Sequence, residues 1–155
     1  MRSLNPEYVT AVCAMASASP YFQLLSMKLV RFEIGACHVE IPVQAKHLQP
    51  FGIVHGGVFS SIIDAAAFWA VFPEIDEDKG LTSVDLKLNY LAPAAAGVLV
   101  ARGKRIKAGR TLALAEATVS DENGKILAYG TSTLMILPSA NLQAGAQPLP
   151  SKFLI

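Results

Sequence analysis

The chain has 155 residues, of which 52% are hydrophobic and 16% are charged. This length is that of one ordinary domain, and a chain so rich in hydrophobic residues is not expected to be disordered. The formal net charge of +1 gives no overall reason to expect binding to nucleic acid or to an anionic membrane surface.

The N-terminal third of the chain predicts two short helices and a pair of strands. Asn5 is suited to cap the first helix, because Pro6 follows it in the first turn. Residues 8–27 carry no charge, but the polar residues among them argue against a transmembrane span. Asn5, Pro6, Glu7 and Thr10 interrupt the basic-then-apolar pattern of a signal peptide. We expect helices over residues 5–16 and 19–25, and strands over residues 28–33 and 36–43 that are joined near Gly35.

The sequence GGVFSSIIDAAAFWAVFPE, residues 56–74, predicts the longest helix, which Pro73 ends. This helix is apolar nearly all round and must therefore be buried on most sides. Long runs of β-forming residues follow it, with hairpin turns at residues 108–109 and 121–124. We expect these strands over residues 81–91, 98–107, 111–120 and 126–137. A tail from Pro138, rich in proline and small residues, is expected to be loosely ordered.

These elements predict a single domain over residues 1–137 and a C-terminal tail over residues 138–155. Consecutive strands with hairpin turns, here four strands in a meander, favour an antiparallel sheet. One sheet and one very apolar helix can bury each other only if the sheet wraps around the helix. The predicted class is therefore α+β, and the predicted fold is the hotdog fold, an antiparallel sheet around a long central helix.

The stretch HLQPFGIVHGGVFSSIIDAAAFWAV, residues 47–71, resembles the central motif of the PaaI-like hotdog thioesterases. In that family His-Gly-Gly begins the central helix and an acidic residue follows nine positions after the histidine, as Asp64 follows His55 here. The flanking stretches agree, so that the resemblance covers about residues 19–137. It implies hydrolysis of acyl-CoA or aryl-CoA thioesters, and we expect the enzyme to be cytoplasmic and to form a homodimer or homotetramer. It implies no cofactor other than the coenzyme A of the substrate, and neither a nucleic acid nor a membrane partner.

Hydrolysis of a thioester builds negative charge on the carbonyl oxygen, which free N–H groups at a helix N-terminus can stabilise. Gly56 N–H is the candidate oxyanion donor, because a glycine lets a ligand approach the backbone closely. Asp64 is the candidate nucleophile or general base, because its apolar neighbours partly desolvate it. The alternative for Gly56 is that it and Gly57 only permit a tight turn. The alternative for Asp64 is that it is paired with a lysine or caps another group.

Three further polar residues are candidates with two interpretations each. His55 either forms a hydrogen bond near the thioester or fixes the loop. Gln49 stands where the family often has asparagine, and either orients the water or the carbonyl or lies in a surface loop. Ser83 matches a family position that supports the carboxylate, but the alternation of the apolar residues after it places Ser83 on the opposite face. A bulge in the strand or a subunit interface could reconcile the two. Asp85 and Lys87 share that polar face and are expected to be solvated.

Basic residues gather around the predicted turn at residues 108–109. They form either an ordinary solvated hairpin tip or, as the resemblance favours, a contact with the phosphates of coenzyme A. This basic cluster comprises Lys104, Arg105, Lys107 and Arg110. Gly57 is a further candidate contact of the substrate. The shape of the acyl pocket is expected to depend on four aromatic residues, Phe51, Phe59, Phe68 and Tyr90.

Neither metal nor redox chemistry is expected. His38 and His47 have no ligand partners at metal-binding spacing. Cys13 and Cys37 also lack such spacing, and we expect both to be reduced thiols in or near the core.

The spacing of Gly56 and Asp64 predicts a dimer. The two residues are eight positions apart, which is about 12 Å along one helix, so one helix cannot bring both to the same carbonyl. We expect a two-fold dimer with antiparallel central helices, in which Gly56 of one subunit faces Asp64 of the other. Two other functions remain open at this point: a hotdog dehydratase of acyl thioesters, and a non-catalytic acyl-CoA-binding protein.

Overall fold

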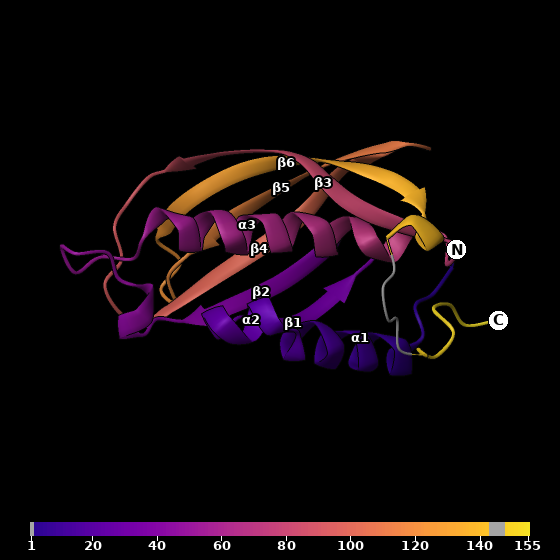
Figure 1. Ribbon diagram of the computed structural model, residues 1–155, viewed down its shortest axis with the longest axis horizontal. Coiled ribbons are helices and arrows are strands. Elements are labelled where there is room, and N and C mark those ends of the chain that lie inside the picture. Colours follow the sequence, from indigo (N-terminus) through magenta and orange to yellow (C-terminus); the bar gives the residue numbers. More distant parts are fainter. Residues whose placement is uncertain (1, 143–147) are drawn as a thin grey trace.

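The computed structural model describes residues 2–142 and 148–155 (Figure 1). One six-stranded antiparallel sheet wraps around the long helix α3 (Gly56–Val71), which confirms the predicted hotdog architecture. The other elements are α1 (Pro6–Ala18), α2 (Pro20–Leu25), β1 (Lys28–Glu33), β2 (Ala36–Pro42), β3 (Lys79–Tyr90), β4 (Val98–Ala108), β5 (Leu112–Ser120), β6 (Ile126–Pro138) and short 3₁₀ helices at Ala45–His47, Phe72–Glu74 and Ser139–Asn141.

Helix α3 forms the centre of the core. Ten of its 16 residues are buried, and its small residues let the sheet approach closely. A Cβ added to Gly103 of β4 would lie only 2.1 Å from the carbonyl oxygen of Ala66. The stretch Gly56–Glu74 is long and apolar enough to cross a membrane, but the sheet uses the same apolar surface as the core of the domain.

One stripe of α3 is not covered by the sheet. It consists of Gly57, Ser60, Ser61, Asp64 and Phe68, each of which is exposed or half-buried. These positions recur at intervals of three and four residues, which places them on one face of a helix. We call this face the open stripe, and it is where the carboxylate predicted to be functional meets solvent.

The strand order, β1-β2-β4-β5-β6-β3, differs from the predicted four-strand meander. Strands β4, β5 and β6 do follow one another, but β4 pairs with β2, and β3 pairs with β6 at the edge of the sheet. The reason is the position of α3 between β2 and β3 in the chain. Because α3 packs across the face of the sheet, β3 emerges on its far side, where β6 offers a free edge.

The C-terminal segment 148–155 packs against the N-terminus, contrary to the expectation of a loosely ordered tail. Leu4 pairs with Phe153 in a β-bridge, and Asn5 N donates to the carbonyl oxygen of Lys152 at 2.9 Å. The Lys152 side chain is 2% exposed, and its Nζ donates to the carbonyl oxygens of Phe72 at 2.7 Å and Ile75 at 2.5 Å. These carbonyls end the central helical segment and favour a cation. Residues 143–147 of the tail lie outside the described residues.

Candidate active site

Asp64 and Ser83 meet where the open stripe of α3 faces the edge strand β3. The Ser83 hydroxyl donates to Asp64 Oδ1 at 2.7 Å. Alternation along the strand predicted the opposite face for Ser83, and that prediction was wrong. A β-bulge between Ser83 and Asp85 reverses the alternation. Ser83 therefore points to α3, as does Leu86 beyond the bulge, whereas Asp85 is exposed as expected.

The surroundings of Asp64 combine buried apolar neighbours with a hydrogen bond from Ser83. Its neighbours Ile63 and Ala65 are buried, and the carboxylate itself is half-buried. Within residues 2–142 and 148–155 no lysine or arginine forms an ion pair with it. The single hydrogen bond from Ser83 fixes Oδ1 and leaves Oδ2 free to accept a proton.

His55 and Gly57 form the cap of α3. His55 is the N-cap residue, and its Nδ1 accepts a hydrogen bond from Gly57 N at 2.8 Å. This contact uses the Gly57 N–H and assigns the ring proton to Nε2. Of the two interpretations of His55, the structure contains the contact that fixes the loop. Gly56 N–H has no hydrogen-bond partner in the part of the chain that the structure describes, so it is free to bind an oxyanion.

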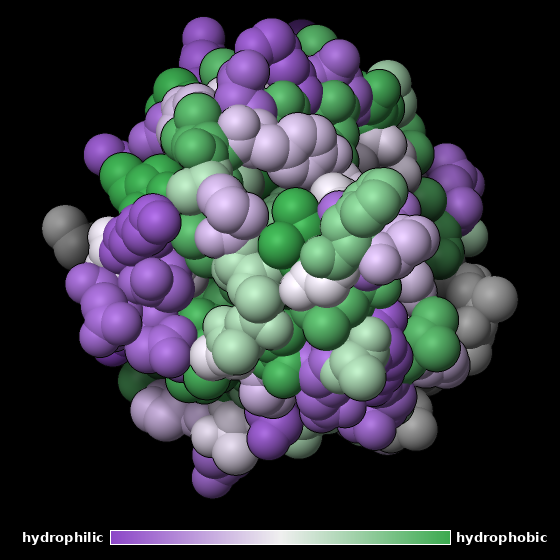
Figure 2. Space-filling view, turned by 90° about the vertical axis from the view of Figure 1, so that its left-hand side faces the viewer, coloured by the Kyte–Doolittle hydropathy of each residue, from purple (hydrophilic) through white to green (hydrophobic). Residues whose placement is uncertain are grey.

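A cavity of about 450 Å³ opens directly in front of Gly56. Gln49 and Phe59 line it, and the Gln49 side-chain oxygen accepts a hydrogen bond from Phe51 N. Figure 2 views this end of the molecule, where hydrophobic and nearly neutral residues cover the middle of the face. Asp64 does not line this cavity. Gly56 and Asp64 of one chain therefore do not line the same cavity.

Tyr90 is a site residue whose position the sequence did not reveal. Its ring lines the cavity at Gly56, and a Cβ added to Gly56 would lie 3.0 Å from the phenol oxygen. The sequence indicated only that Tyr90 helps to shape a pocket. Its proximity to Gly56 depends on the bulge in β3, because the bulge sets which later residues of β3 face α3.

The basic cluster does not form one surface. Arg105 Nε forms an ion pair with Glu74 Oε1 at 2.5 Å, and its backbone N–H donates to Gly35 O at 2.9 Å. Lys104 is exposed and points to the other face of β4, because neighbouring residues of a strand alternate. Lys107 and Arg110 are exposed and line one shallow cavity. A bulge between Arg105 and Lys107 returns Lys107 to the face of Lys104, but of the four basic residues Lys107 and Arg110 are the two that line this cavity.

No group of three or more metal-ligating side chains occurs among the described residues. His47 is 1% exposed, and both of its ring nitrogens are engaged. Nδ1 accepts from Gln44 N at 2.9 Å, and Nε2 lies 2.7 Å from Leu25 O. His47 therefore holds the loop before α3 in place.

The sequence profile of the Thioesterase superfamily matches residues 51–128, a stretch that contains Gly56, Asp64, Ser83 and the whole of α3. The chain belongs to the thioesterase superfamily. This membership confirms the family resemblance seen in the sequence and identifies the chain as a thioester hydrolase.

Named relatives of this thioesterase agree with that assignment. The chain is 31% identical over 120 residues to a Saccharolobus solfataricus protein described as an esterase, with 77% of this chain and 85% of that protein covered. It is 28% identical over 114 residues to the 1,4-dihydroxy-2-naphthoyl-CoA hydrolase of Listeria monocytogenes, with 74% and 93% covered. A thioesterase from Haemophilus influenzae shares the fold, with a TM-score of 0.78, 23% identity and coverage of 89% and 96%.

Proposed function

We propose that this thioesterase hydrolyses acyl-CoA thioesters, aryl-CoA thioesters among them, to the free acid and coenzyme A. The observation that carries the proposal is the hydrogen bond from Ser83 to Asp64 on the open stripe of α3. It holds a half-buried carboxylate in place with one oxygen free for proton transfer. The name of the Listeria relative, which is a hydrolase of an aryl-CoA thioester, supports this substrate class.

Asp64 is the general base or the nucleophile of the proposed reaction. As a base it takes a proton from water, which then attacks the carbonyl carbon. As a nucleophile it forms an acyl anhydride that water hydrolyses. In both routes the C–S bond breaks, and the coenzyme A thiolate leaves and takes up a proton. Ser83 donates to Oδ1 and stabilises the charged carboxylate, while Oδ2 acts.

Gly56 N–H stabilises the oxyanion in this proposal. It is unpartnered and stands at the N-terminus of α3, where the helix dipole favours negative charge. A single donor of this kind contributes roughly 10²–10³ in rate in other enzymes. Gln49 lines the same cavity, and we assign its free amide group to the orientation of the carbonyl or of the attacking water.

The two groups come from different subunits of a homodimer. Gly56 and Asp64 are eight residues apart on α3, which separates them by about 12 Å. In a two-fold dimer that pairs Gly56 with Asp64 of the partner, the axis passes at Ser60, midway between them. The open edge of β3 supports this arrangement, because Val84 on that edge is a large apolar residue that is 53% exposed. Two such dimers can pair into a tetramer.

We assign the binding of the coenzyme A phosphates to the basic residues at the C-terminal end of β4 and in the turn that follows it. Lys107 and Arg110 are the pair that the structure leaves free for phosphate groups. Lys104 shares the outward face of β4 with Lys107, because of the bulge between Arg105 and Lys107, but it does not line their cavity. Arg105 is held by Glu74. Cys13 and Cys37 are both free thiols, which suits a cytoplasmic location.

The test is a thiol-release assay on coenzyme A thioesters of short, long and aromatic acids. We expect release of coenzyme A from at least one class, dependent on Asp64. A dehydratase would instead remove water from a hydroxyacyl-CoA without releasing thiol. A non-catalytic binder would show saturable binding of coenzyme A and no thiol release. Either outcome, with a correctly folded protein, would contradict the proposal.

A further inference from the structure

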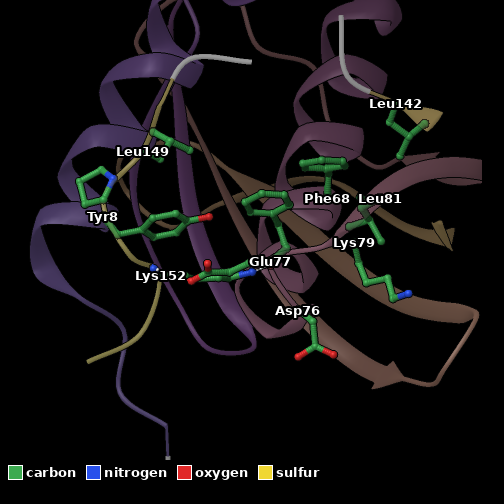
Figure 3. Close-up of a pocket in the computed structure, with 12 residues that line it drawn as sticks. Tyr8, Phe68, Asp76, Glu77, Lys79, Leu81, Leu142, Leu149 and Lys152 are labelled. Carbon is green, nitrogen blue, oxygen red and sulfur yellow. Dashed lines mark hydrogen bonds between the residues drawn. The ribbon is translucent and has the colours of Figure 1, made fainter. Parts of the chain in front are cut away.

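A cavity lies at each end of α3. The cavity of about 360 Å³ at the C-terminal end is walled by side chains from distant parts of the chain, among them Tyr8, Phe68 and Lys152 (Figure 3). The cavity of about 450 Å³ at the N-terminal end is lined by Gly56 and Gln49, the two residues assigned above to the reacting carbonyl. Whatever holds these two residues in place therefore affects how well the oxyanion is bound.

The direction of Gly56 N–H is set by the backbone of His55, because both residues share one peptide unit. His55 is held at both of its backbone groups. Its carbonyl oxygen accepts from Val58 N at 3.0 Å, a bond that every helix start contains. Its N–H donates to the carbonyl oxygen of His47 at 2.8 Å. This second bond depends on where the fold places His47.

Gln49 depends on the same anchor. It lies in the loop between His47 and His55, and the tip of this loop is unpacked, since Phe51 is 89% exposed. The loop is held at its base, where Val54 N donates to a carbonyl of the segment after β3 at 2.8 Å and His55 N donates to His47. The base of the loop thus sets the position of the Gln49 amide in the cavity.

His47 connects the backbones of three elements. It is 1% exposed. Its Nδ1 accepts from Gln44 N, at the start of the 3₁₀ helix, at 2.9 Å, and its Nε2 donates to Leu25 O, at the end of α2, at 2.7 Å. Its own carbonyl oxygen binds the N-cap residue of α3. The neutral imidazole with its proton on Nε2 satisfies both ring contacts at once.

No apolar side chain could replace these ring contacts. Without the imidazole, Gln44 N and Leu25 O would lose their partners beside the core, and a buried backbone group without a partner is costly. None of the six residues of α2 is buried, so α2 depends on polar contacts such as this one and the 2.6 Å contact of Tyr21 with Ser61 on α3. We therefore expect the base of the loop to shift when the imidazole is lost.

We propose that His47 is a positioning residue of the oxyanion site, and that its imidazole fixes the direction of Gly56 N–H and the place of Gln49. The inference rests on the proposed thioesterase function and deepens it, because it names the support of the oxyanion donor. His47 does not line the cavity. It acts through the backbone of His55 and touches neither the substrate nor the reacting carbonyl.

The test is steady-state thiol release by His47→Leu, with the coenzyme A thioester that the wild type hydrolyses fastest. Leucine fills the core position and forms neither ring contact. kcat should fall roughly 10- to 10²-fold, because a displaced donor stabilises the oxyanion less. KM should change by less than about twofold, since the loss falls on the transition state.

The matched control is His38→Leu. His38 lies in β2 between the buried residues Cys37 and Val39, so its side chain points to the outer face of the sheet, where it contacts Glu40. Its replacement should leave kcat and KM unchanged.

A double-variant cycle separates positioning from a general loss of structure. Gly56→Ala puts a methyl group 3.0 Å from the Tyr90 ring, and we expect this crowding to weaken binding of the oxyanion to Gly56 N–H. Adding His47→Leu to Gly56→Ala should then lower kcat no further. A merely structural effect would lower kcat by the same factor in both backgrounds.

His47→Gln covers the case in which His47→Leu does not fold. Its side-chain amide can donate to Leu25 O in place of Nε2, and it loses the acceptor for Gln44 N. In the wild-type background it should lose at least about threefold in kcat, and in the Gly56→Ala background it should cause no further loss.

The outcomes separate this inference from the proposed function. Wild-type kcat in folded His47→Leu, a raised KM with unchanged kcat, or an equal further loss in the Gly56→Ala background would overturn the role of His47 and leave the thioesterase function standing. If the wild type releases no thiol from any coenzyme A thioester, the proposed function fails and this inference fails with it.

Discussion

The Ser83 hydroxyl lies 2.7 Å from Asp64 Oδ1, although the two residues are 19 positions apart and belong to different elements. A single bulged residue in β3 makes this contact possible. Without it, Ser83 would face solvent and Asp64 would lack its donor. The hydrogen bond orients the carboxylate and leaves its second oxygen for chemistry, and this relationship leads to the first two predictions.

Asp64→Asn should lower kcat by at least about 10²-fold and leave KM nearly unchanged, because the amide keeps the shape and loses the base or nucleophile. Steady-state thiol release measures both constants. The matched control is Asp85→Asn, because Asp85 lies just beyond the bulge and its side chain is exposed. Near wild-type turnover by Asp64→Asn would remove this residue from the mechanism.

Ser83→Ala should lower kcat by about tenfold and leave KM nearly unchanged, because Asp64 loses the hydrogen bond that orients its carboxylate. Steady-state thiol release measures both constants. Ser83→Thr, which keeps the hydroxyl, should restore kcat. If Ser83 acts through Asp64, adding Ser83→Ala to Asp64→Asn should lower kcat no further. A further tenfold loss in the double variant would show that Ser83 does not act through Asp64.

The sequence predicted most elements because their signals are local. Asn5 caps α1 as expected, its side chain accepting from Glu7 N at 3.0 Å, and Pro73 follows the last residues of α3. The position of β3 and the face of Ser83 could not be predicted in this way. Strand order depends on where α3 lies in space, and a bulge leaves no local signal strong enough to override alternation. The ion pair of Arg105 with Glu74 and the burial of Lys152 likewise depend on contacts between residues far apart in the chain.

The double charge reversal Lys107→Glu/Arg110→Glu should raise KM for acyl-CoA substrates at least severalfold. It should leave a short thioester without the nucleotide unaffected, because that substrate carries no phosphate for these residues to bind. Arg105→Glu serves as the contrast, since it opposes Glu74 and should lower the free energy of unfolding. Equal effects of Lys107→Glu/Arg110→Glu on both substrate types would rule out a contact with coenzyme A.

Lys152 should make stability depend on pH between about 8 and 10. Burial lowers the pKa of Lys152 from 10.5 to about 8. Between these values the unfolded chain binds a proton that the folded chain lacks, so this group makes the free energy of unfolding rise with pH. Below pH 8 both states are protonated, and its contribution is constant and unfavourable.

Denaturant unfolding of the wild type and Lys152→Met at fixed protein concentration measures this dependence. The stability of the wild type relative to the variant should increase by up to about 2 kcal/mol between pH 8 and pH 10. Measurements stop there because the raised pKa of Tyr8, about 12, acts with the opposite sign above pH 10. Lys125→Met, which changes an exposed turn lysine, should leave the profile unchanged. A flat difference for Lys152→Met would mean that Lys152 stays charged throughout.

The shared active site can be tested with two inactive variants in one dimer. Gly56→Ala places a methyl group 3.0 Å from the Tyr90 ring, and we expect this crowding to narrow the cavity that both residues line in front of Gly56 N–H. Alanine suits the first turn of a helix, so the fold should be kept. Asp64→Asn removes the carboxylate. In the proposed dimer each homodimer then has two defective sites.

A mixed dimer of these two chains has one site with both defects and one site with neither. The intact site combines Gly56 from the Asp64→Asn chain with Asp64 from the Gly56→Ala chain. Mixed dimers isolated with two different affinity tags should therefore recover about half of the wild-type kcat per dimer, whereas both parent homodimers stay at least about 10²-fold below it. If Gly56 and Asp64 acted within one chain, every site of the mixed dimer would carry one defect. Activity no higher than that of the parents, or a fully active monomer, would therefore overturn the shared site.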